Sequence, residues 1–104
     1  NLGGSLQQNA PQASFAFDYN ADTNVTITHE TGDSIETAQL NTSGLATNSV
    51  AWDDKVGSDT VSAGTGAEFN NTDPWNSETV RVVWVSENGE NSATLSTSTA
   101  PDNT

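Results

Sequence analysis

The chain has 104 residues, about the size of one common domain, and no apolar run approaches the roughly 18 residues that a membrane-spanning helix needs. Fourteen acidic residues stand against one lysine and one arginine, so the formal net charge is −12, and such a surface repels the phosphates of nucleic acids. There is no cysteine, which excludes disulfides and thiolate metal sites.

The low apolar content would permit disorder. Leu, Ile, Val and Phe make up 18 of the 104 residues, a share that is typical of disordered chains when the net charge is high. Here, however, the apolar residues alternate with polar ones in separate short runs, which is the pattern of half-buried strands. Salt shortens the Debye length from ~10 Å at 0.1 M to ~3 Å at 1 M and so weakens self-repulsion. We therefore expect a folded β domain from the extracellular space of a halophile.

Two alternating runs near the N-terminus predict a hairpin. Residues 13–19 place three aromatic side chains on one face, and residues 24–30 place Val25, Ile27 and His29 on one face. The polar residues between the two runs are typical of a turn. We expect the two strands to pair.

The middle of the chain contains weaker strand candidates, and no part of it has the periodicity of a helix. These candidates span residues 35–40, 45–52, 60–63 and 67–69. In residues 45–52, Val50 and Trp52 share a face. We expect short strands here, separated by glycine and other turn residues.

Residues 79–97 give the strongest strand signal. Asn88-Gly89 can supply the positive φ angles of a tight turn between two strands, which predicts a second hairpin. The two faces of its first strand carry Val80, Val82 and Trp84 on one side and Arg81, Val83 and Val85 on the other. Because both faces are largely apolar, we expect this strand to be central or to pack against a further segment.

Seven or eight short strands without helical periodicity predict an all-β fold, an antiparallel two-sheet sandwich of the immunoglobulin-like type. The sandwich should span residues 13–99. Residues 1–12 are expected to be a hinge that includes the remnant of an N-terminal helix, and residues 100–104 a C-terminal tail.

Residues that could carry chemistry are few. His29 is the single histidine and continues an inward strand face, so a structural role is favoured over catalysis. Asp53, Asp54 and Asp59 could offer oxygen ligands to calcium, but Lys55 lies among them and the spacing is not that of an EF-hand loop, so a solvated acidic loop is favoured. The sequence predicts no enzyme, no metal site and no cofactor.

Two further features bear on the surface. Asn24, Asn41 and Asn70 begin Asn-X-Ser/Thr sequons, and Asn41 and Asn70 have loop-like surroundings in which a glycan would be best accommodated. Trp75 stands in a turn-rich stretch and could be an exposed platform on which a sugar stacks. The favoured alternative is that Trp75 closes one end of a small core that needs its large aromatics.

Several segments, in order, carry a resemblance to a known family. They are APQASFAFDY at 10–19, VTITHE at 25–30, GDSI at 32–35, VRVVW at 80–84 and SENG at 86–89. Together with the acidic background, this series of strand and turn patterns resembles the haloarchaeal type IV pilins. In that family a charged leader is removed by a prepilin peptidase, and a long apolar N-terminal helix anchors the subunit and bundles into the filament core.

The resemblance implies a structural subunit of an archaeal pilus, whose β headgroup forms the outer surface and serves surface adhesion and cell aggregation. Residues 1–6 look like the end of the helix, and residues 7–12 would be the hinge, stiffened by Pro11. The apolar helix and the processing site are absent from this sequence, so we expect a form that lacks them.

The partners implied are other pilin subunits, through the absent helix, and surfaces or other cells. Contact with a membrane would occur only through that helix, and the location would be the cell surface. Arg81, Val83 and Val85 are our candidates for a lateral contact between headgroups. The alternative function is a secreted β-sandwich carbohydrate-binding module that uses Trp75.

Overall fold

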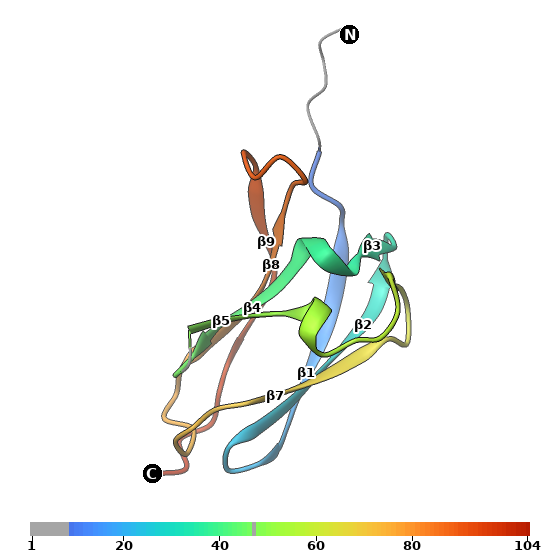
Figure 1. Cartoon of the computed structure of the whole chain (residues 1–104). Helices are drawn as coiled ribbons and strands as arrows, with labels where there is room; N and C mark the ends of the chain where they lie inside the picture. The colour runs from blue at the N-terminus through green and yellow to red at the C-terminus, as the bar shows by residue number, and fades with distance from the viewer. Residues whose placement is uncertain (1–8, 47) are drawn as a thin grey trace, which may run out of the picture.

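The computed structural model describes residues 9–46 and 48–104 (Figure 1). The strands of this part are β1 (Ala13–Ala21), β2 (Asn24–Gly32), β3 (Ile35–Glu36), β4 (Leu40–Leu45), β5 (Asn48–Ala51), β6 (Thr60–Val61), β7 (Gly66–Asn70), β8 (Thr79–Val85) and β9 (Ser92–Thr99). Two 3-10 turns, η1 (Thr37–Gln39) and η2 (Trp52–Asp54), are the helical elements of the described residues. The predicted helix remnant over residues 1–6 lies outside the described residues, as does residue 47.

The strands form an antiparallel two-sheet sandwich, as predicted. One sheet has the order β1-β2-β7 and the other the order β5-β4-β8-β9, while β3 and β6 form a small separate ladder. If the strands are lettered as in immunoglobulin domains, the two sheets read A-B-E and C′-C-F-G, which is the immunoglobulin arrangement. The described chain has nine strands rather than seven or eight, because the two-residue strands β3 and β6 count separately.

Large aromatic side chains compensate for the low apolar content. The core takes alternate residues from both sheets, among them Val25 and Ile27 of β2 and Val80 and Val82 of β8, all fully buried. All three tryptophans are at most 3% exposed. One tryptophan side chain buries about 150–250 Å². The three tryptophans therefore add a large apolar area to that of the 18 Leu, Ile, Val and Phe residues.

The open edges of the two sheets meet where β1 lies beside β9, without a backbone ladder between them. The Phe15 N–H donates to Ser96 Oγ at 3.0 Å, and the Tyr19 hydroxyl donates to Ser98 Oγ at 2.8 Å. The numbers of the paired residues rise together, so the two strands run in the same direction. Serine side chains therefore hold this side of the sandwich together.

Both predicted hairpins are present, but the second has a different turn. The β1–β2 and β8–β9 pairs are antiparallel. Of Asn88 and Gly89, only Gly89 has a positive φ, at 76°, so the predicted turn with two such residues is wrong. Instead, the Gly89 N–H donates to Ser86 O, and Asn88 Oδ1 accepts from the Ser86 hydroxyl at 2.7 Å. This side-chain bond supports a longer connection between the strands.

The expected C-terminal tail is bound to the loop before β8. The Ala100 N–H donates to Glu78 O at 2.8 Å, and the Asn103 N–H donates to Trp75 O at 2.7 Å. Ala100 itself is buried. The last residues thus close one end of the sandwich, opposite the end at which the described chain enters β1 (Figure 1).

Candidate functional site

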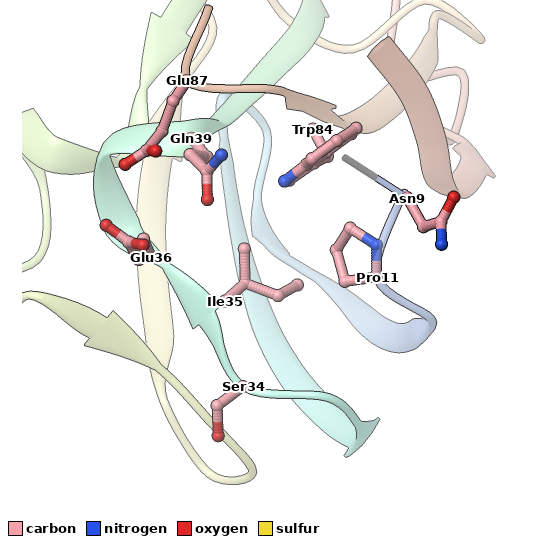
Figure 2. A pocket seen from close by; sticks show the side chains of 8 residues that line it. All are labelled: Asn9, Pro11, Ser34, Ile35, Glu36, Gln39, Trp84 and Glu87. Carbon is pink, nitrogen blue, oxygen red and sulfur yellow. The ribbon is translucent and has the colours of Figure 1, made fainter. Parts of the chain in front are cut away.

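A pocket of about 360 Å³ lies at the end of the sandwich where the chain enters β1 (Figure 2). Its apolar walls are Pro11, Ile35 and Trp84. Its polar lining consists of Asn9, Ser34, Glu36, Gln39 and Glu87. The entry segment, the β3–η1 connection and the end of β8 each contribute, so three parts of the chain that are distant in sequence form it.

Trp84 forms the inner wall of the pocket. It is the last inward residue of β8, opposite Leu40 of β4, and is only 3% exposed. Its indole nitrogen points into the space beside Ile35 and Gln39 (Figure 2). Within the described part of the chain this N–H has no hydrogen-bond acceptor.

The other two indoles are satisfied inside the protein. Trp52 Nε1 donates to Thr42 Oγ1 at 2.9 Å. Trp75 Nε1 lies 3.2 Å from the carbonyl oxygens of both Ala21 and Asn24. Among the described residues, His29 Nδ1 is the one buried side-chain nitrogen or oxygen without a partner, so Trp84 Nε1 still reaches solvent. Its N–H is therefore available to water or to a ligand in the pocket.

The polar side of the pocket is rich in acceptors. Glu36 and Glu87 are exposed carboxylates, and Gln39 is half-buried between β3 and β4. The lining includes neither Lys55 nor Arg81, the two cations of the chain. An ionised carboxylate only accepts hydrogen bonds, whereas the side chains of Asn9, Ser34 and Gln39 can both donate and accept. The lining therefore offers acceptors as well as donors, with the Trp84 N–H among the donors.

Trp75 is fully buried, so the prediction that it is an exposed stacking platform is wrong. Its ring meets Tyr19 edge-to-face with centroids 5.2 Å apart. It closes the end of the sandwich below the β1–β2 turn, as the favoured alternative predicted. Turn residues surround Trp75 in the sequence, but the carbonyl groups of that hairpin turn bind its N–H and bring the ring inside.

His29 is a core residue, in agreement with the structural role favoured from the sequence. It is fully buried, and its ring meets Phe15 edge-to-face at 5.2 Å. His29 Nε2 lies 2.8 Å from Asp33 O, and because a carbonyl only accepts, Nε2 carries the proton. Nδ1 is buried without a partner in the described chain. No described nucleophile is hydrogen-bonded to this ring.

The acidic loop has the character of a solvated surface. Asp53 and Asp54 lie in η2, and they are exposed, as are Lys55 and Asp59. Over residues 9–46 and 48–104, no three His, Asp or Glu side chains are grouped so that they could hold a metal ion.

The three sequons lie in different settings. Asn24 is half-buried and its side-chain amide donates to Glu68 at 3.2 Å. Asn41 lies inside β4 between Ala51 and Val83, so its expected loop-like setting is wrong. Asn70 is the exposed last residue of β7, which pairs with β2 on one side only. Asn70 is therefore also in a strand, but at its accessible end.

Arg81, Val83 and Val85 share the outer face of β8, as expected from their alternation. β8 is central in its sheet, between β4 and β9. Arg81 is exposed, whereas the two valines remain half-buried. This face is therefore an accessible strip with one cation beside two apolar side chains.

No protein-family model matches the chain, and no curated protein is significantly similar to it in sequence. The part of the chain that the structure describes contains no helix long and apolar enough to cross a membrane.

Proposed function

We propose that this domain is the exposed headgroup of an archaeal type IV pilus subunit, which serves surface adhesion and cell aggregation in high salt. The sequence resemblance to haloarchaeal type IV pilins supports the proposal. Its structural support is the way the chain enters the sandwich: Asn9 to Gln12 lead in at one end, and the C-terminus is bound at the other (Figure 1). This arrangement is compatible with a headgroup mounted on an N-terminal stalk.

Two hydrogen bonds fix the point at which the chain enters the sandwich. The Gln12 N–H donates to the Asp33 carboxylate at 2.9 Å, and the Asp33 N–H donates to Gln12 O at 2.8 Å. This reciprocal pair fixes the head end of the predicted hinge to the loop after β2. Force or motion passed along the hinge would therefore reach the sandwich at Gln12.

In this function the outer face of β8 is the candidate contact between headgroups. A filament needs a heterologous contact that does not close into a ring, and Arg81 beside Val83 and Val85 offers a cation and apolar area to an acidic neighbour. The alternative function, a secreted carbohydrate-binding module, would need a site other than Trp75, because that side chain is buried.

Immunogold labelling with antibodies against this domain tests the proposal on intact cells of the source organism. We expect gold along the length of surface filaments, and an apolar stretch of about 20 residues encoded upstream of this domain. Deletion of the gene should remove the labelled filaments and reduce attachment. Label found only in the medium, or spread evenly over the cell surface in cells that have filaments, would contradict it.

A further inference from the structure

We propose that the pocket at Trp84 binds a neutral sugar ring. The inference goes beyond the proposed function, which assigns no ligand to the domain, and it does not depend on whether the domain belongs to a pilus. It stands on the indole N–H, which has no hydrogen bond within the described chain, on the acceptors among the lining residues and on the size of the pocket.

The indole N–H decides which chemical class can bind. Trp84 is only 3% exposed, and its N–H points into the pocket without an acceptor in the described chain (Figure 2). Because Trp84 Nε1 still reaches solvent, a ligand that displaces water here must present an acceptor to this donor, or the donor loses its hydrogen bond to water without a replacement. An ammonium or guanidinium group has no acceptor, so it cannot satisfy the Trp84 N–H.

The opposite side of the pocket requires donors from the same ligand. Glu36 offers an exposed carboxylate, and Gln39 offers both a carbonyl oxygen and an amide group. A hydroxyl group donates one hydrogen bond and accepts others, so neighbouring hydroxyls of one ring can accept from Trp84 and donate to Glu36. Polyhydroxyl compounds combine these properties at short spacing.

The apolar walls of the pocket and the net charge of the protein further restrict the class of ligand. Pro11 and Ile35 provide apolar surface on which the C–H groups of a sugar ring can pack. The volume of about 360 Å³ lies near the lower end of the roughly 300–1,000 Å³ typical of ligand pockets, which suits a single ring. A net charge of −12 with two carboxylates in the lining disfavours uronic acids and sulfated sugars. A neutral ring remains.

The three indole N–H resonances of the ¹⁵N-labelled chain provide the test. D-glucose, D-galactose, D-mannose and N-acetyl-D-glucosamine are titrated separately, in NaCl sufficient to keep the amide spectrum dispersed. We expect at least one sugar to shift the Trp84 resonance saturably, with a Kd on the order of 1–10 mM for a ligand of about a dozen heavy atoms. Trp52 and Trp75, whose N–H groups are bound internally, should not shift.

Surface variants separate binding from folding. Glu36→Ala removes an exposed carboxylate that makes no capping bond, so the fold should persist while sugar affinity falls about tenfold. Glu30→Ala is the matched control, because it removes one exposed carboxylate from β2 outside the pocket and should leave the affinity unchanged.

Three results would overturn the inference. The first is that none of the four sugars shifts the Trp84 resonance of the folded chain. The second is that Glu36→Ala and Glu30→Ala change the sugar affinity, measured from the Trp84 shift, by the same factor. The third is that methylammonium chloride, used as a probe, saturates the Trp84 shift and loses affinity as NaCl is raised, which would assign the pocket to a cation instead.

Discussion

At the scale of single residues, Tyr19 is a partly buried ionisable group whose pKa is shifted by the fold. It is the single tyrosine of the chain, and burial raises the pKa of its hydroxyl above 10.0. The hydrogen bond with Ser98 lowers the pKa in part, and the negative charge of Glu78 raises it further. Because the folded state favours the protonated hydroxyl, this group stabilises the fold fully below the unfolded pKa. That contribution is lost as the pH rises through the folded pKa.

We therefore expect the phenolate absorbance of the native chain to appear at a higher pH than in the unfolded chain, and the free energy of unfolding to fall from about pH 10 upward. Denaturant titrations over that pH range measure the second effect. Tyr19→Phe should flatten the alkaline fall. A native titration curve that coincides with the unfolded one would show that Tyr19 is not buried as described.

Gly44 is a position where only glycine is tolerated. Its φ is +94°, and a Cβ added there would lie 2.0 Å from Thr79 O, in the stretch where the β4–β5 register shifts. Gly44→Ala should lower the free energy of unfolding by about 2–4 kcal/mol, from backbone strain and displacement of β8. In Gly57→Ala, where an added Cβ meets nothing within 4 Å, we expect a change within about 0.5 kcal/mol, measured by the same urea titration.

Asn70 is the sequon residue most accessible to a glycosylating enzyme. It is exposed at the end of β7 and its side chain has no hydrogen bond within the described chain, whereas Asn24 and Asn41 are half-buried in strands. If the chain is glycosylated, intact mass should show a single occupied site that Asn70→Gln abolishes. The same mass loss from Asn24→Gln or Asn41→Gln would contradict this assignment.

At the scale of secondary-structure elements, the β1–β9 contact depends on serine side chains. Ser96→Ala leaves the Phe15 N–H without its acceptor in a partly buried position, so the free energy of unfolding should fall by about 1–2 kcal/mol. Ser92→Ala, at an exposed position of the same strand, is the control and should change it by less than about 0.5 kcal/mol. Equal effects of the two substitutions would mean that the serine bond does not hold the strands together.

The strands with clear alternation were predictable because their pattern is local. β1, β2, β8 and β9 all follow from residues that lie next to one another in sequence. The run at residues 45–52 was predicted as one strand, but Asn48 has a φ of 73° and the run is divided between β4, β5 and η2. The two-residue ladder of β3 and β6 depends on tertiary contact, which sequence periodicity does not report.

The candidate site was harder to predict than the fold. The alternation correctly placed Trp84 inside, but its pattern does not reveal that the ring edge faces a pocket built from Pro11, Ile35 and Gln39. For Trp75, the flanking turn residues indicated exposure, whereas carbonyl acceptors from a distant hairpin determine its burial. In both cases the decisive neighbours are far away in sequence.

At the scale of the whole molecule, the negative charge of the carboxylates is almost uncompensated by cationic side chains. Neither Lys55 nor Arg81 forms an ion pair with any described residue, so the carboxylates repel one another across the surface. The midpoint of thermal unfolding should therefore rise as NaCl is raised from about 0.1 to 1 M, by roughly 4–8 °C for each kcal/mol of repulsion removed. Calorimetry measures the midpoint directly.

Removing charge should weaken this salt response. A combined Asp53→Asn, Asp54→Asn and Asp59→Asn variant lowers the negative charge on exposed loop positions and should reduce the dependence of the midpoint on NaCl. A midpoint that is the same in dilute buffer and in molar salt for the unsubstituted chain would contradict the expectation of a saline habitat.

The parallel course of β1 and β9 determines how the domain would respond to tension. The described chain enters at the head of β1 and ends beyond the far end of β9 (Figure 1). A pull between these two points would slide the strands past each other, so that the Phe15–Ser96 and Tyr19–Ser98 links are loaded in shear, at the same time rather than one after another. Resistance to such a pull would be a property of the rate of unfolding, which equilibrium stability does not set.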